Sequence, residues 1–169
     1  RMRACCVVGR VGALCAPWPV SARRIALAVA LALHVLVSGG AVSRFVAEII
    51  FYQGLGDLFG GRNRGQVIAS SVIGSLEYAV EIVGVPLIVV LSHENCGAVS
   101  AALEQDHPES TPLPPHIAEI TDVIAPAVTR VRLSRDLKPG ELDAPEAVGR
   151  EHMRDTVSVL LASSELISD

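Results

Sequence analysis

Aromatic residues make up only 4% of this 169-residue chain, and acidic residues outnumber basic ones, which gives a formal net charge of −4. A nucleic-acid-binding domain usually presents a basic face and aromatic stacking platforms, so we expect no nucleic-acid partner. The 14 glycines and 10 prolines show no period, and no internal repeat is present, which excludes collagen-like and solenoid folds. The length and the apolar content of 50% predict one globular domain at most.

Cysteine is scarce and unevenly placed. Three of the four cysteines, Cys5, Cys6 and Cys15, lie in the first fifteen residues, and the fourth is Cys96. A disulfide-stabilised fold needs cysteines distributed along the chain. The spacing therefore favours a reducing compartment, and we expect a cytoplasmic protein.

The first 47 residues contain no acid but six arginines: Arg1, Arg3, Arg10, Arg23, Arg24 and Arg44. Residues 25–37 are apolar apart from His34, and this run is shorter than the ~20 residues that span a bilayer, so we expect no membrane span. A signal or transit peptide and an arm that packs on a partner subunit are alternatives for residues 1–33. We favour a third interpretation, an unassigned leader with no structure of its own.

From residue 34 onward, short apolar runs alternate with helical patterns. Strands are expected at residues 34–38, near Leu58 and at residues 87–91, and helices at residues 45–50, 67–83, 117–131 and 145–167. The run at residues 87–91 has five consecutive apolar residues, three of them β-branched, which is typical of a central parallel strand buried on both faces. The pattern predicts an α/β fold with a parallel-sheet core flanked by helices.

Helical spacing also predicts which side chains face the core. In the helix at residues 67–83 these are Val72, Leu76, Ala79, Val80 and Val83. In the last helix they are Val148, Met153, Val157, Leu160, Leu161 and Leu166. No strand follows that helix in this sequence, so we expect an incomplete sheet with an exposed edge.

The sequence His93-Glu94-Asn95-Cys96-Gly97 directly follows the apolar strand at residues 87–91. Open α/β sheets place their sites at the carboxyl ends of strands. A histidine and a cysteine three residues apart can bind one Zn²⁺, although a buried cysteine beside a hydrogen-bonded histidine is also common without metal. We expect His152, in the last helix, to be a packing or solvated residue, and a proton shuttle is the alternative.

Residues 39–103 resemble the bacterial β-class carbonic anhydrases. The resemblance is carried by Ala47-Glu48-Ile49-Ile50-Phe51, by Gln53-Gly54-Leu55-Gly56-Asp57, by Ser71 through Val80 and by Val85 through Val99. It implies a domain over residues 34–169 and a zinc lyase that hydrates CO₂ reversibly to bicarbonate with a zinc-bound hydroxide. It also implies a homodimer or a higher homo-oligomer.

In that family a C-x-D-S-R motif supplies one zinc ligand and an Asp–Arg dyad, and the H-x-x-C pair supplies two further ligands. The resemblance aligns the first motif with Gly40-Ala41-Val42-Ser43-Arg44, so glycine replaces the ligand and valine replaces the carboxylate. The implied site retains His93 and Cys96 as metal ligands and Arg44 and Gln53 as catalytic residues. With two ligands, zinc is expected to be weakly held or absent, so an active enzyme and an inactive relative or decayed product both stay open. Replacement of the lost ligand by Cys5, Cys6 or Cys15 is a further alternative.

Overall fold

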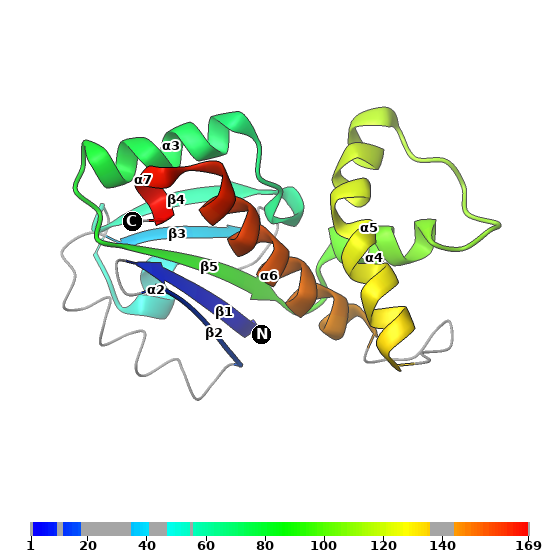
Figure 1. The fold of residues 1–169 in the computed structure, drawn as a ribbon. Helices are drawn as coiled ribbons and strands as arrows, with labels where there is room; N and C mark the ends of the chain where they lie inside the picture. Colours follow the sequence, from blue (N-terminus) through cyan, green and yellow to red (C-terminus); the bar gives the residue numbers. More distant parts are fainter. Residues whose placement is uncertain are drawn as a thin grey trace.

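The computed structural model of the chain describes residues 2–9, 12–17, 35–40, 47–54, 56–135 and 144–168. Helices pack against a five-stranded sheet whose strand order is β2-β1-β5-β3-β4 (Figure 1). The elements in chain order are β1 (Met2–Gly9), β2 (Gly12–Pro17), β3 (Val35–Gly40), α2 (Ala47–Phe51), β4 (Leu58–Asn63), the 3₁₀ helix η1 (Arg64–Gln66), α3 (Ser70–Glu81), β5 (Leu87–His93), α4 (Gly97–Gln105), α5 (Pro115–Arg135), α6 (Ala144–Ser163) and α7 (Glu165–Ser168).

The three strands predicted from the pattern form the parallel core of the sheet. β3 is parallel to both β4 and β5, and β5 is the central strand, as its apolar sequence indicated. Ile88, Val89, Val90 and Leu91 of β5 are all buried, which is the pattern of a strand covered on both faces. The α/β fold class is confirmed.

The N-terminal strands correct two expectations. β1 runs antiparallel to β5 from Met2 opposite His93 to Gly9 opposite Leu87, and β2 runs antiparallel to β1. The sheet is therefore mixed rather than wholly parallel, and the interpretation of the leader as a segment without structure is wrong for these two strands. β5 has a neighbour on each side, so the outermost described strands are β2 and β4. The domain boundary at residue 34 stays a prediction.

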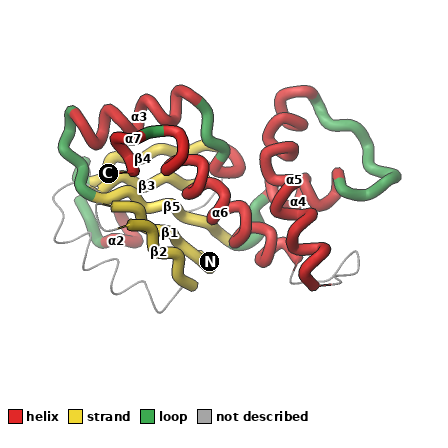
Figure 2. The backbone as a smooth tube through the Cα atoms, in the orientation of Figure 1, coloured by secondary structure: helices red, strands yellow, loops and turns green. Residues whose placement is uncertain are grey.

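Apart from the short α2, the α-helices form two groups. α3, α6 and α7 lie on one side of the sheet, whereas α4 and α5 lie beyond the carboxyl end of β5 (Figure 1). The proline-rich connection between α4 and α5 projects away from the sheet (Figure 2). Among the residues that the structure describes, no helix combines the length and the apolar character needed to cross a membrane.

Two groups of buried side chains correspond to this division. The first joins β5 to α3, α6 and α7 and contains Leu76, Ala79, Val85, Ile88, Val90, Met153, Val157, Leu160 and Ile167. The second joins α4, α5 and the start of α6 and contains Ala98, Val99, Ala102, Ile124, Ala127, Val128, Val131, Ala147 and Val148. α6 contributes to both, so it connects the sheet to the outer helices.

The prediction of one continuous last helix over residues 145–167 is wrong at its carboxyl end. The helix stops at Ser163, and α7 starts at Glu165 after a break at Ser164. The buried Ser164 hydroxyl donates a hydrogen bond to Glu77 Oε1 of α3 at 2.7 Å. This break changes the helical phase, so Ile167 is buried instead of Leu166, which is 38% exposed. Val83, also predicted to face the core, lies beyond the end of α3 and is 37% exposed.

Candidate metal site

The candidate site lies where three parallel strands end. Gly40 is the last residue of β3 and is registered with Asn63, the last residue of β4. Gly39 is registered with Leu91, two residues before the end of β5 at His93. Because adjacent strands lie about 4.8 Å apart, the backbone of residue 40 lies beside the end of the strand that carries His93.

His93 and Cys96 are joined by a short turn and are both half-buried. β5 ends at His93, and Cys96 is the N-cap residue of α4. Asn95 between them has a φ of 53°, in the left-handed region that asparagine tolerates better than most residues. His93 Nδ1 lies 2.8 Å from the carbonyl oxygen of Glu94, and we assign a donated N–H there. That assignment leaves Nε2 for Cys96 or a metal, as in metal-binding histidines whose second nitrogen bonds a carbonyl.

The two side chains shift each other's pKa in opposite directions. The hydrogen bond with Cys96 raises the pKa of His93, and partial burial opposes it without reversing the result. Burial is the largest single influence on Cys96 and raises its pKa. Hydrogen bonds from His93 and from the backbone N–H groups of Val99 and Ala98 outweigh burial, so the pKa of the thiol lies below its ordinary value. This environment favours the thiolate, which is the form that binds metal.

The donor set does not complete a catalytic zinc site. Catalytic zinc normally has three protein ligands and an open position. No cluster of three or more histidine, cysteine, aspartate or glutamate side chains suited to a metal is found in the described parts of the chain. Gly40, at the position implied for the third ligand, has no donor atom. His93 and Cys96 therefore supply two of the three protein ligands that a catalytic zinc normally has.

The structure does not test the roles of the two predicted catalytic residues. Arg44 lies outside the described residues, as do Val42 and Ser43. Gln53 follows α2, and its side-chain Nε2 donates a hydrogen bond to the carbonyl oxygen of Phe51 at 2.9 Å. This bond is internal to the turn after α2. The roles of Arg44 and Gln53 stay predictions.

Arg64 is a charged neighbour that the sequence analysis missed. It is exposed at the start of η1, and its Nη1 lies 4.0 Å from where a Cβ on Gly97 would be. Gly97 directly follows Cys96 and is the first residue of α4, so a guanidinium lies beside the start of this helix. A positive charge at this position opposes a bound cation. In the sequence, the feature that could have pointed to Arg64 as a site residue was its position directly after the end of a parallel strand.

The turn that carries Arg64 is held from α6. Gly65 has a φ of 69° and Gln66 a φ of 56°, so two consecutive residues are left-handed. The imidazole of His152 hydrogen-bonds the carbonyl oxygen of Gly65. The Thr156 hydroxyl lies 3.4 Å from the carbonyl oxygen of Gln66 and 3.0 Å from that of His152, which is the nearer acceptor for its single proton. His152 is thus a buried packing residue, as predicted.

The fold and the site together define a class of protein. It is an α/β protein that carries a histidine–cysteine pair at the carboxyl end of its central strand. The sequence profile of the family described as carbonic anhydrase matches residues 35–169. The chain is 43% identical to carbonic anhydrase 2 of Mycobacterium tuberculosis over 134 residues, which cover 79% of this chain and 61% of that protein. It is 39% identical to a carbonic anhydrase of Mycolicibacterium smegmatis over 146 residues, covering 86% and 68% of the two chains.

The fold agrees with this match. Tetrameric β-carbonic anhydrases from Sordaria macrospora superpose with a TM-score of 0.65 at 17% identity, over 84% of this chain and 72% of that chain. The chain therefore belongs to the β-class carbonic anhydrase family. It spans about six-tenths of the length of the M. tuberculosis relative.

Proposed function

We propose that this chain has the β-carbonic anhydrase scaffold with an incomplete zinc site and does not hydrate CO₂ at an enzymatic rate. The observation that carries this proposal is Gly40. It ends β3 beside the carboxyl end of β5, at the position where the family resemblance implies a cysteine ligand. CO₂ and bicarbonate are the substrates that an intact site of this family would take.

Two differences in charge, one lost negative charge and one added positive charge, support weak metal binding. The resemblance places Val42 where a carboxylate accompanies Arg44, so the loss of that carboxylate removes a negative charge from the implied site. Arg64 adds a positive charge close to Gly97. Both changes disfavour a divalent cation, while His93 and Cys96 alone supply fewer ligands than zinc normally takes. Zinc is therefore lost readily on dialysis.

An active enzyme with a substitute ligand is the second candidate. Its support is the register of β1, in which Cys5 is opposite Leu91, two residues before His93. Two strand residues span about 6.6 Å, so the backbone of Cys5 lies near the sheet edge that carries the site. Under this candidate the unmodified chain retains zinc, and Cys5→Ser removes it, whereas Cys15→Ser, on the outer strand β2, does not.

Stopped-flow CO₂ hydration distinguishes the two candidates. The unmodified chain, Gly40→Cys, Val42→Asp and the double variant are compared, with circular dichroism as the check that each is folded. Our proposal predicts activity only in the double variant, because one substitution supplies the ligand and the other the dyad carboxylate. Zinc-dependent activity in the unmodified chain contradicts the proposal and favours the Cys5 alternative.

Assembly and location are part of the same proposal. The tetrameric relatives from S. macrospora and the exposed apolar side chains of Ile49 and Tyr52, 71% and 89% accessible, support a homodimer or a higher homo-oligomer. The cysteine distribution supports a cytoplasmic location. Light scattering on the purified chain measures the assembly, and a monomer at all concentrations contradicts this part of the proposal.

A further inference from the structure

A cavity of about 340 Å³ lies between η1, α5 and α6. Ile68, Val123, Pro126 and Val159 form its apolar walls. None of the residues implied for zinc or CO₂ lines it. Pockets that take small organic molecules are about 300–1,000 Å³ and combine apolar walls with a few polar groups. This cavity is at the small end of that range and suits a single-ring molecule.

Gln66 supplies the polar group. The residue is 6% exposed and lines the cavity, and its hydrogen-bond contact with Thr156 involves its backbone carbonyl oxygen rather than its carboxamide. The unpartnered polar side-chain atoms that are sealed from solvent in the described parts are Asn63 Oδ1 and His152 Nδ1. The Gln66 carboxamide is not among them, and Gln66 is one of the residues that line the cavity. A ligand with matching donors and an acceptor exchanges hydrogen bonds with this carboxamide in place of water.

The backbone of Gln66 is fixed in an unfavourable conformation. Its φ of 56° is uncommon for a residue with a side chain, and the Thr156 hydroxyl lies 3.4 Å from its carbonyl oxygen. Strained conformations of this kind persist where the surroundings impose them, and they concentrate at binding sites.

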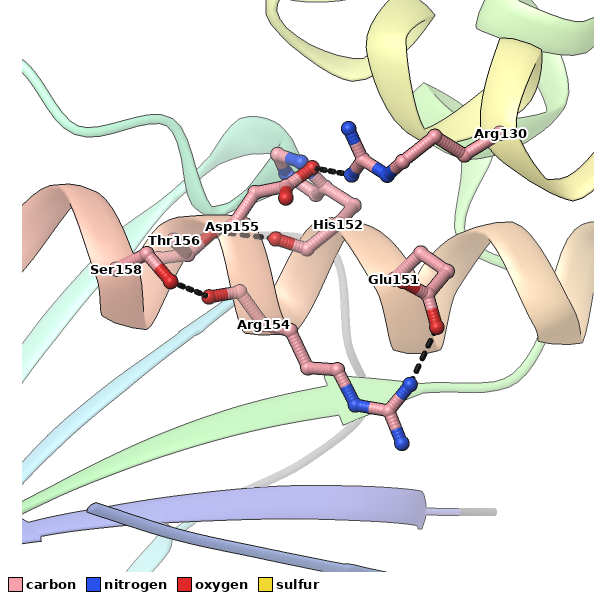
Figure 3. Close-up of polar contacts among 7 residues, drawn as sticks. All are labelled: Arg130, Glu151, His152, Arg154, Asp155, Thr156 and Ser158. Atoms are coloured by element: carbon pink, nitrogen blue, oxygen red, sulfur yellow. Dashed lines mark hydrogen bonds and ion pairs between the residues drawn. The ribbon is translucent and has the colours of Figure 1, made fainter.

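The cavity lining carries no net charge. Arg130 reaches across from α5 and pairs with Asp155 of α6 (Figure 3). Burial, the largest influence, lowers the pKa of His152, and its hydrogen bond to Gly65 and the charge of Asp155 oppose this without reversing it. The histidine is therefore neutral near pH 7. A charged ligand would lose hydration without gaining an opposite charge.

We infer that this cavity binds a neutral small molecule with one apolar ring and a primary carboxamide. The carboxamide of such a ligand pairs with that of Gln66 through reciprocal N–H to C=O hydrogen bonds, since each group has donors and an acceptor. The ring packs on Val123, Pro126 and Val159. This site is separate from the proposed zinc site, and its occupancy does not depend on metal.

Saturation-transfer NMR with benzamide and the full-length chain tests the inference. Gln66→Gly removes the carboxamide at a backbone conformation that glycine adopts without strain. Val159→Trp fills the cavity from a position that is 45% exposed. Leu133→Trp is the matched control, because Leu133 is 76% exposed on α5 and does not line the cavity. Thermal unfolding checks that each variant is folded.

The expected result is saturable benzamide binding that is at least about tenfold weaker in Gln66→Gly and Val159→Trp, as expected for the loss of two hydrogen bonds or of the ring's space. The control binds as the unmodified chain does, and benzoate binds more weakly than benzamide. The inference is overturned if benzamide shows no saturable binding to the unmodified chain, if both cavity variants bind it unchanged, or if benzoate binds equally well.

Discussion

His152 on α6 hydrogen-bonds through Nε2 to the carbonyl oxygen of Gly65, 87 residues earlier in the chain. Both residues are buried. The bond connects the long helix behind the sheet to the left-handed turn that follows β4. Because burial lowers the pKa of His152 overall, the folded chain binds a proton at this residue less readily than the unfolded chain.

The first prediction concerns the pH dependence of stability. The unfolded chain takes up a proton at His152 as the pH falls through about 6.5, whereas the folded chain does so only at a lower pH. The contribution of His152 is thus complete above the unfolded pKa and is lost as the pH falls from there toward the folded pKa. Urea unfolding between pH 5 and pH 8 measures this slope.

His152→Leu removes that contribution. It leaves the Gly65 carbonyl unpaired, so we expect a loss of about 1–3 kcal/mol at pH 7.5 and a smaller slope between pH 5 and pH 7. The control is His116→Leu, since the side chain of His116 is 93% exposed. An unchanged slope in His152→Leu would show that His152 does not titrate in this way.

The second prediction compares two glycines. A Cβ on Gly65 would lie 3.1 Å from Ala98 Cβ and 3.1 Å from Ile120 Cγ2, at a φ of 69°, so Gly65→Ala destabilises the fold by more than about 1 kcal/mol. Gly74 lies within α3 with nothing within 4 Å of the corresponding position. Gly74→Ala therefore stabilises by about 0.5–1 kcal/mol. Urea unfolding gives both values, and shifts of the same sign would refute this account.

Some of the fold was readable from the sequence because the local pattern and the packing agree. The run at residues 87–91 is apolar throughout, and it forms the central strand of the sheet, of which residues 88–91 are buried. The sequence pattern did not predict that Ile167 rather than Leu166 is buried in the core. The helix breaks at Ser164, whose hydroxyl bonds Glu77. That bond links residues 87 positions apart, and no periodicity within one helix encodes it.

The third prediction tests the core around α6. Leu160 is completely buried in the group that joins β5, α3 and α6. Leu160→Ala leaves a cavity there, so we expect a loss of about 2–5 kcal/mol. Leu133→Ala is the same chemical change at a 76% exposed position, and it alters stability by no more than about 0.5 kcal/mol. Equal losses would contradict the packing described for α6.

The fourth prediction concerns the reactivity of Cys96. Because the pKa of this thiol is lowered by His93 and by backbone N–H groups against the effect of burial, iodoacetamide modifies Cys96 half-maximally at a lower pH in the folded chain than in urea. His93→Gln moves that midpoint to higher pH, and the exposed-histidine control His116→Gln does not. Mass spectrometry of the Cys96 peptide measures the rate. A midpoint unaffected by His93→Gln would exclude the interaction.

The candidate site was predictable only in part. The H-x-x-C spacing identified His93 and Cys96, since a short turn after a strand limits where both side chains lie. Gly40 was singled out only through the family resemblance. Independently of it, the strand register places the backbone of residue 40 beside the end of the strand that carries His93. Arg64 was missed because its proximity to Gly97 arises from the packing of η1 against α4, which are more than thirty residues apart in the chain.

The fifth prediction concerns zinc itself, and zinc content per chain is its most direct test. Elemental analysis after dialysis compares the unmodified chain with the Gly40→Cys, Val42→Asp double variant, each purified with zinc present. The account predicts far less than one zinc per chain in the unmodified protein and close to one in the double variant. One zinc per unmodified chain would show that another residue supplies the missing ligand and would contradict the central claim.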